Sequence, residues 1–236
     1  MNIAVIIAGG AGVRMGQDIP KQFLNVFDKP VIVYTLEAFQ QHPMIDAIEV
    51  VCIDGWHDVL KAYCKQFGIT KLDNVVSGGA NGQESIHNGV TDLMTRHNSD
   101  DVVLIHDAIR PMVTAEIITN CIKVCQQYGN AITVIPCAEA MLLTADGLSA
   151  DDQIARSSLK RTQTPQAFHL GDLADAHAEA QKRGITNSIA SCTLFVELGR
   201  KVYFSAGAEK NVKLTTPEDI EIFKALLKSK NSEWIK

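Results

Sequence analysis

The sequence has no excess of basic residues and no long apolar run, and these two absences narrow its function. It carries 22 Lys and Arg against 27 Asp and Glu, a formal net charge of −5. A protein that coats nucleic acid needs a net basic face, so we expect no nucleic-acid partner. No apolar stretch approaches the roughly 20 residues of a membrane span, and the opening MNIAVIIAGG lacks the basic start and cleavage site of a signal peptide. We therefore expect a cytoplasmic protein with a small-molecule partner and no membrane contact.

Two familiar signatures are also missing. The six cysteines include no C-x-x-C pair, so they fit neither a zinc ribbon nor a thioredoxin motif, and we expect them to be small core residues. The loop AGGAGVRMG places Gly10, Gly12 and Gly16 in the spacing G-x-G-x-x-x-G, and no G-x-x-x-x-G-K-[ST] is present. This spacing argues against an NAD-dependent oxidoreductase, which would need G-x-G-x-x-G and an acidic residue at the end of the second strand.

What the sequence does contain is a regular alternation of strand and helix patterns. A chain of 236 residues that is 46% hydrophobic can bury the core of one large domain, so we treat 1–236 as a single domain. Short β-branched runs alternate with segments of helical period, the runs at 2–8, 47–53, 101–107, 131–137 and 201–207 and the helical segments at 30–40, 84–96 and 115–128. This pattern predicts a Rossmann-like α/β fold, with a mostly parallel sheet, helices on both faces and ligands at the carboxyl ends of the strands.

The segment 139–161 interrupts this alternation. It has a glycine turn and weak strand signals but no convincing helix, and it is too long for an ordinary connection in a compact α/β domain. We predict a β-hairpin arm that protrudes from the body. Since an isolated hairpin is marginally stable in water, docking on a twofold partner is a sensible solution, and we expect a homodimer formed through the arm.

The glycine loop after the first strand indicates a phosphate site. Backbone N–H groups of such loops approach phosphate closely, and here Arg14 lies within the loop while Lys21 follows it in the sequence PKQ. A guanidinium fork together with a mobile ammonium suits a triphosphate. The alternatives are a tight turn with two solvated cations, or a non-catalytic nucleotide sensor, which would keep the loop but could dispense with Lys21 and Lys213.

The sequence LIHDAIRP predicts a second group of site residues. Asp107 ends a strand, where its carboxylate could bind Mg²⁺ or accept a hydrogen bond from a substrate hydroxyl, and Arg110 could bind a second phosphate. His106 and Asp107 also match the core of metal-dependent phosphohydrolases, although the further histidines of that chemistry are missing nearby. A turn-capping aspartate paired with an arginine is the simplest alternative.

A second glycine-rich loop, SGGANGQESIHNG, precedes a predicted helix that Glu84 or Ser85 could begin. Gly79 and Gly82 would let a base or ribose approach the backbone, and Ser85 could hydrogen-bond a pyrimidine edge. A plain strand-to-helix connection explains the same residues.

Two Thr-Pro pairs look like helix starts. Thr216 is a candidate N-cap with Pro217 in the first turn and Asp219 completing a capping box. Thr164-Pro165 in QTPQAF has the same form, and we expect a helix to begin there also.

Taken together, these motifs resemble the cytidylyltransferases of the methylerythritol-phosphate and ribitol-phosphate type, which make CDP-alcohols from CTP. AGGAGVRMG, PKQ, HDAIRP, QTPQAF and NVKLTTPED occur in the family's order over nearly the whole chain. The resemblance implies that CTP and an alcohol-phosphate are the substrates, that Mg²⁺ is the cofactor and that the arm is exchanged within a dimer. It also assigns the site residues: Ala8, Gly9, Gly10, Gly12, Arg14 and Lys21 to the CTP phosphates; Gly79, Gly82 and Ser85 to cytosine; Asp107, Arg110, Arg156 and Thr164 to the acceptor, with Asp107 near the metal; and Lys213 to the reacting phosphate.

The chain departs from this family in the half that would bind the alcohol. Glu139 and Ala140 stand where the family usually has Asp-Thr, and Asn187 replaces an aspartate. The family also often has an arginine at the position of Asn81 or Gly82. These departures favour an alditol phosphate such as ribitol 5-phosphate over 2-C-methyl-D-erythritol 4-phosphate, and leave another polyol or sugar phosphate open.

Overall fold

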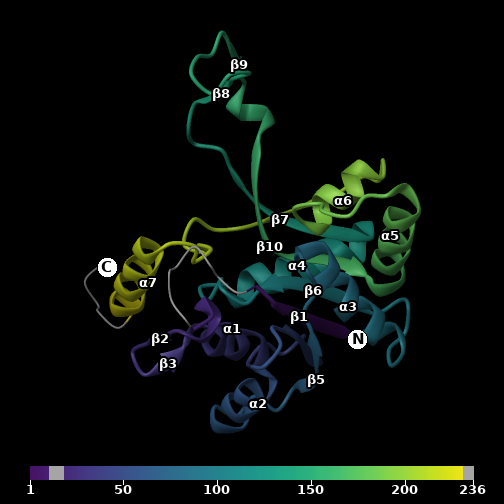
Figure 1. The fold of residues 1–236 in the computed structure, drawn as a ribbon, viewed down its shortest axis with the longest axis vertical. Helices are drawn as coiled ribbons and strands as arrows, with labels where there is room; N and C mark the ends of the chain where they lie inside the picture. Colours follow the sequence, from purple (N-terminus) through teal and green to yellow (C-terminus); the bar gives the residue numbers. More distant parts are fainter. Residues whose placement is uncertain (11–18, 231–236) are drawn as a thin grey trace.

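The computed structural model describes residues 1–10 and 19–230, which form one seven-stranded sheet with helices packed on both faces (Figure 1). In spatial order the strands are β11 (Phe204–Ala206), β7 (Asn130–Pro136), β10 (Lys160–His169), β6 (Val102–Asp107), β1 (Asn2–Ala8), β4 (Ala47–Cys52) and β5 (Leu72–Ser77). All pairings are parallel except those of β10, which runs antiparallel to both β6 and β7. The predicted mostly parallel sheet is therefore confirmed.

The alternation of side chains along β1 explains why both faces are covered. Ala4, Ile6 and Ala8 point into one buried cluster, whereas Ile3 and Val5 point into another. The first cluster includes residues of α1 (Val31–Gln40), α2 (His57–Gln66) and α4 (Ala115–Tyr128). The second includes residues of α3 (Gly82–Met94), α5 (Leu170–Arg183) and α6 (Ser191–Glu197). Sheet and helices thus form three layers with a core on each side of the sheet.

The last helix, α7 (Pro217–Lys230), packs beside the small hairpin of β2 (Asn25–Val26) and β3 (Lys29–Pro30). Phe223 of α7 is fully buried in this third cluster together with Val26 and Leu214. The predicted capping box is confirmed, because the Thr216 hydroxyl accepts from the Asp219 N–H at 3.3 Å and the Asp219 carboxylate accepts from the Thr216 N–H at 2.8 Å. Because α7 begins at Pro217, the irregular segment that carries Lys213 ends at Thr216.

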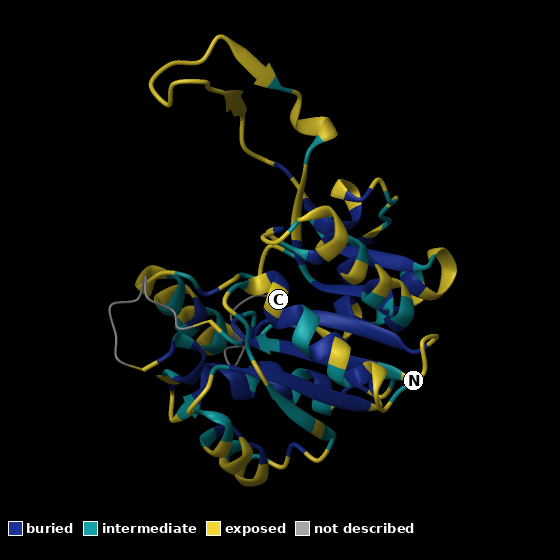
Figure 2. Ribbon diagram, turned by 45° about the vertical axis from the view of Figure 1, so that its right-hand side comes forward, coloured by how far each residue is buried: buried dark blue, intermediate teal, exposed yellow. Residues whose placement is uncertain are grey.

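The arm predicted over 139–161 leaves the body as a separate projection (Figures 1 and 2). It contains the two-stranded pairing of β8 (Met141–Leu143) with β9 (Asp152–Ile154) and a 3₁₀ turn at Arg156–Ser158. Every residue from 138 to 153 is exposed, including the apolar side chains of Met141, Leu142 and Leu148. The protruding hairpin is confirmed, and its docking on a partner stays a prediction.

The helix expected at Thr164-Pro165 is wrong, since both residues lie within strand β10 and the helix α5 begins only at Leu170. The pairing of β10 with β7 shifts register between Thr162 and Gln166, so the sheet does not require an N–H from the proline at this irregularity. The predicted strand over 201–207 is shortened to Phe204–Ala206. Sequence analysis also missed β5, in which no residue is fully buried, and α2, in which only Leu60 and Cys64 are buried.

The cysteines behave as expected, because all six are buried and free. Within the described ranges, no helix is both long enough and apolar enough to cross a membrane.

Candidate functional site

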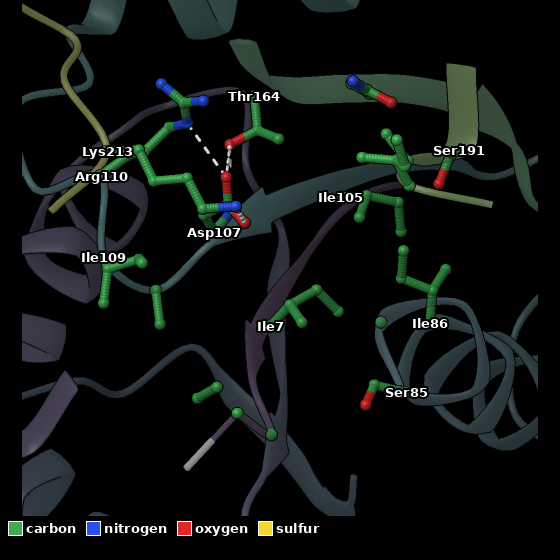
Figure 3. A pocket seen from close by; sticks show the side chains of 18 of the residues that line it. Ile7, Ser85, Ile86, Ile105, Asp107, Ile109, Arg110, Thr164, Ser191 and Lys213 are labelled. Carbon is green, nitrogen blue, oxygen red and sulfur yellow. Dashed lines mark hydrogen bonds and ion pairs between the residues drawn. The ribbon is translucent and has the colours of Figure 1, made fainter. Parts of the chain in front are cut away.

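A cavity of about 760 Å³ opens where the parallel strands end, and most of the predicted site residues line it (Figure 3). Their side chains or backbones come from β1, α3, β6, β10 and the segment before α7. The predicted residues that the cavity brings together are Ala8, Gly9, Gly10, Lys21, Gly79, Gly82, Ser85, Asp107, Arg110, Thr164 and Lys213. This is the edge at which open α/β sheets bind ligands.

The first wall of the cavity is the end of β1 together with the 3₁₀ turn Lys21–Phe23. The buried Gln22 side chain joins them, because its amide donates to the carbonyl of Ala8 at 2.8 Å and to that of Gly10 at 3.0 Å. Phe23, the last residue of the turn, stacks on Trp56 with ring centroids 4.5 Å apart and so anchors the turn to the body of the protein. Lys21 is thereby held beside the start of the glycine loop, as a phosphate site requires.

The second wall is the loop between β5 and α3, which touches the first glycine loop directly. A Cβ on Gly78 would lie 2.9 Å from the Cα of Gly9, so the two backbones can approach only because neither residue carries a side chain. Ser85 stabilises this loop from within: its buried hydroxyl accepts from the Gly79 N–H at 3.0 Å and donates to the Asn81 carbonyl at 2.9 Å.

The helix α3 begins with Asn81 as its N-cap and Gly82 as its first residue, slightly earlier than predicted. The Asn81 side chain accepts from the Glu84 N–H at 2.9 Å. Gly82 is exposed and lines the cavity.

The third wall centres on Asp107 at the end of β6. Lys213 Nζ donates to Asp107 Oδ1 and Arg110 Nε donates to Oδ2, each at 3.0 Å, while the Asp107 N–H donates to the Thr164 hydroxyl at 3.0 Å. Figure 3 shows these three side chains converging on Asp107, with Ser85 on the far side of Ile7. Burial opposes the charged form of Asp107, but the charges of Lys213 and Arg110 outweigh it and hold the pKa of this carboxyl below its ordinary value. The site therefore presents an ionised carboxylate between two cations.

His106 does not belong to the cavity. Its ring is fully buried on the opposite side of β6, where it lies 5.0 Å from the ring of Phe39 and its Nε2 lies 3.2 Å from the Arg110 carbonyl. Burial lowers the pKa of His106 to about 4, so the imidazole is neutral and its N–H supports the turn from Asp107 to Arg110. His106 and Asp107 therefore do not face the same cavity and do not form a phosphohydrolase centre.

Three predicted residues are not brought into the cavity by the described chain. Gly12 and Arg14 lie outside the described residues. Arg156 lies on the arm, where its guanidinium donates to the Ala138 carbonyl at 3.3 Å, and it is absent from the described residues that line the cavity of its own chain.

The structure adds residues that sequence reasoning missed. Ile7, Ile86 and Ile105 form an apolar floor between the glycine loops and Asp107 (Figure 3). Gln22 belongs to the motif PKQ and Gln163 precedes Thr164, but the sequence assigned neither residue a role. No spacing in the sequence predicts their hydrogen bonds, because the acceptors are backbone carbonyls.

The arrangement can bind a polyphosphate at the glycine loops and a second anion near Arg110 and Lys213. The apolar floor and the close-packed loop of 78–82 can accept a flat base between them. Within the described ranges no group of three or more His, Cys, Asp or Glu side chains could hold a metal ion by itself. Lys213 and Arg110 beside Asp107 can position phosphate groups and offset their charge.

Comparison with known proteins agrees with this geometry. The model of the family described as IspD, 2-C-methyl-D-erythritol 4-phosphate cytidylyltransferase, matches residues 2–229. The ribitol-5-phosphate cytidylyltransferase of Lacticaseibacillus paracasei is 45% identical, with 98% of this chain and 99% of that protein covered. The 2-C-methyl-D-erythritol 4-phosphate cytidylyltransferase of Clostridium acetobutylicum is 36% identical over 98% of this chain and 99% of its own length.

The fold agrees as well. The crystal structure of 4-diphosphocytidyl-2C-methyl-D-erythritol synthase from Anaerococcus prevotii superposes with a TM-score of 0.83 at 25% identity, covering 97% of this chain and 96% of that one. The family match covers almost the entire chain, and the resemblance read from the motifs is confirmed. The chain belongs to the 2-C-methyl-D-erythritol 4-phosphate cytidylyltransferase family and is a nucleotidyltransferase of the cytidylyl-transferring kind.

Proposed function

We propose that this cytidylyltransferase moves CMP from CTP to ribitol 5-phosphate, giving CDP-ribitol and pyrophosphate. The observation that carries the proposal is the pairing of Asp107 with both Lys213 and Arg110 in one cavity with the two glycine loops. Relatives named ribitol-5-phosphate cytidylyltransferase, at 45% and 41% identity, support this acceptor. Ala140, which stands where the family usually has a hydroxyl, supports a changed acceptor half as well.

The chemistry requires no strong base. An alcohol-phosphate has a second pKa near 6 and is mostly dianionic at pH 7. One of its oxygens attacks the α-phosphorus of CTP, a new P–O bond forms, and the bond to the oxygen bridging the α- and β-phosphates breaks as pyrophosphate leaves with that electron pair. Lys21 and Arg14 would offset the charge on the triphosphate, and Lys213 the charge on the reacting phosphate.

Asp107 would hold a magnesium ion when CTP is bound. A single carboxylate fits such an ion, because Mg²⁺ is commonly bound through one or two carboxylates together with substrate phosphates. The ion would neutralise phosphate charge. Asp107 itself orients Lys213 and Arg110, and the Thr164 hydroxyl and Arg110 would face the acceptor.

We also propose that the chain works as a homodimer in which the arm carries Arg156 to the acceptor phosphate of the neighbouring site. The proposal is supported by the exposed apolar side chains of the arm and by the way the arm, which carries Arg156, projects away from the sheet that contains β6 (Figure 1). A free hairpin of two three-residue strands is marginal in water, so a partner surface would stabilise it.

A second acceptor, 2-C-methyl-D-erythritol 4-phosphate, is favoured by the relative from Clostridium acetobutylicum that is named for it. Pyrophosphate release from CTP separates the two candidates when the purified enzyme is given ribitol 5-phosphate, 2-C-methyl-D-erythritol 4-phosphate and other polyol phosphates at equal concentration. We expect the highest kcat/KM with ribitol 5-phosphate. A higher value with any other acceptor contradicts the assignment of the alcohol and leaves the cytidylyl transfer intact.

A further inference from the structure

Asn211 stands at a junction of three site residues although it does not line the cavity. It is fully buried, two positions before Lys213 in the segment between β11 and α7. Its side-chain amide donates to the Thr164 carbonyl at 2.9 Å, and its own backbone carbonyl accepts from Arg110 Nη1 at 2.8 Å. One residue thus touches the backbone of Thr164 and the guanidinium of Arg110.

Gln163 completes this junction from β10. Its amide nitrogen donates to the Ala208 carbonyl at 2.9 Å, and its amide oxygen accepts from the Ala208 N–H and from Asn211 Nδ2, each at 3.3 Å. A Cβ on Gly207 would lie 2.4 Å from the same oxygen, so the two segments are in close contact. The Gln163 side chain therefore binds the backbone of 207–211 as a neighbouring strand would.

Lys213 depends on this junction because no regular element holds its backbone. Residues 207–215 contain neither strand nor helix, and the next anchor is the Leu214 N–H, which donates to the Ile109 carbonyl at 2.9 Å. The Lys213 side chain is a flexible stem and is 43% exposed, so the place of its ammonium is set by where the backbone lies. Asn211 and Leu214 are the two fixed points on either side of it.

The Asn211 side chain joins its segment to β10 through its amide nitrogen and not through its amide oxygen. Its Oδ1 atom is buried and has no hydrogen-bond partner in the described part of the chain. A buried acceptor without a partner costs free energy. The contribution that the structure shows for this side chain is therefore that of its amide nitrogen, which bonds Gln163 and Thr164 of β10.

We propose that Asn211 is a positioning residue: its side chain, together with Gln163, fixes the backbone that carries Lys213 against Thr164, so that the ammonium reaches Asp107 and the reacting phosphate. The inference rests on the proposed function, because it takes Lys213 to act on the transferred phosphate. Asn211 itself touches no substrate.

The first experiment compares Asn211→Ala with Asn130→Ala, a matched control. Asn130 is also buried, and it joins β7 to the segment before β11 through the Lys201 carbonyl and the Tyr203 N–H, at 3.0 Å each. It lies at the opposite end of β7 from the site. At a temperature where both variants are folded by circular dichroism, we expect Asn211→Ala to lower kcat on the order of 100-fold, since a displacement near 1 Å is enough for that. The KM for CTP should stay within about twofold in both variants, and kcat should stay unchanged in Asn130→Ala.

The second experiment measures the same substitution in a Lys213→Ala background. If Asn211 acts through Lys213, the loss in kcat caused by Asn211→Ala should nearly vanish there, a coupling that a purely structural role does not produce. An undiminished loss overturns the inference, and so does wild-type kcat in Asn211→Ala. Should Asn211→Ala not fold, Gln163→Met releases the same segment from the other side and should show the same coupling.

If both variants are unfolded, the junction serves folding and the inference is wrong. Lys213→Ala alone separates this inference from the proposed function. Wild-type kcat in Lys213→Ala contradicts both the proposed function and the positioning role. A strongly lowered kcat in Lys213→Ala together with a wild-type kcat in Asn211→Ala contradicts only the positioning role.

Discussion

Lys213 and Asp107 are 106 residues apart in sequence, yet the Lys213 ammonium lies 3.0 Å from one carboxylate oxygen of Asp107. The other oxygen accepts from Arg110. The carboxylate therefore orders two cations that come from different parts of the chain, and it does so at the end of the central strand β6. This relationship gives the site its charge pattern before any substrate arrives.

Lys21→Ala and Lys213→Ala should each lower kcat by about 100-fold or more while the protein stays folded, because a cation aimed at developing charge contributes most in the transition state. Lys201→Ala is the control, since Lys201 is exposed and lies over the Tyr203 ring, outside the cavity. Steady-state pyrophosphate release with the preferred acceptor measures the effect. Wild-type turnover in either cavity variant would refute the assigned role of that lysine.

The enzyme should prefer CTP to ATP. Gly78 brings its loop into close contact with Gly9, and Gly79 and Gly82 of the same loop line the cavity. We expect a pocket lined by this backbone to accept a pyrimidine and to exclude the larger purine ring. Competition assays that give kcat/KM for each nucleotide test this expectation. Equal values would leave a general nucleotidyltransferase and remove the basis for a cytosine pocket.

Gly78→Ala and Gly82→Ala should differ sharply although both change one glycine of the same loop. A Cβ at Gly78 meets the backbone of Gly9 at 2.9 Å, whereas a Cβ at Gly82 meets nothing within 4 Å. We expect Gly78→Ala to destabilise the fold by about 1–3 kcal/mol through overpacking and to raise the KM for CTP. Thermal unfolding should leave Gly82→Ala at the wild-type Tm, and equal Tm values for the two variants would contradict the close approach.

Acid should destabilise the protein in part through His177. Burial, with the neighbouring His87 as a smaller cause, lowers the pKa of His177 to about 4, from an ordinary value of 6.5. The unfolded chain therefore takes up this proton first, so the stability that His177 contributes is present above pH 6.5 and is lost as the pH falls toward 4. Between pH 8 and pH 5 the loss should be about 2 kcal/mol.

Urea unfolding at pH 8 and at pH 5 measures this loss. His177→Gln should show a smaller acid destabilisation than the wild type, with His169→Gln, at the half-exposed position before the same helix, as the control. An equal loss in His177→Gln and wild type would show that this imidazole is not the group responsible.

The arm can be tested by complementation. Arg156→Ala and Lys21→Ala should each be nearly inactive, but in a mixed dimer with exchanged arms one site collects both defects and the other collects none. With random exchange about half of the dimers are mixed, and roughly a quarter of all sites regain both residues. Recovery toward that level supports action in trans. Native mass spectrometry verifies the exchange, and no recovery after verified exchange means that Arg156 acts in its own chain or not at all.

The sequence was sufficient for features that depend on local pattern. The β-branched runs predicted β1, β4, β6 and β7, and the position of Asp107 at a strand end predicted its place at the ligand edge. The arm followed from the lack of periodicity over 139–161. These predictions succeed because each rests on residues that are close together in the chain.

Features that depend on distant contacts could not be predicted in this way. Thr164-Pro165 has the local form of a helix start, but pairing with β6 and β7 on both sides draws it into β10. Lys213 was found only through the family resemblance, since nothing around it predicts contact with Asp107. Apart from the bond between their own amides, Gln163 and Asn211 bind backbone groups, which every residue carries, so these partners leave no trace in the sequence.

Because β10 runs against its neighbours, it enters the sheet at the edge where the other strands leave it. The arm connects β7 to β10 and must therefore rise from that same edge, beside the cavity (Figure 1). In a sheet of uniform direction, the connection would have returned across a helical layer to the opposite edge. Reversing one strand thus places the arm beside the cavity, so a partner subunit that bound the arm would lie close to the bound substrate.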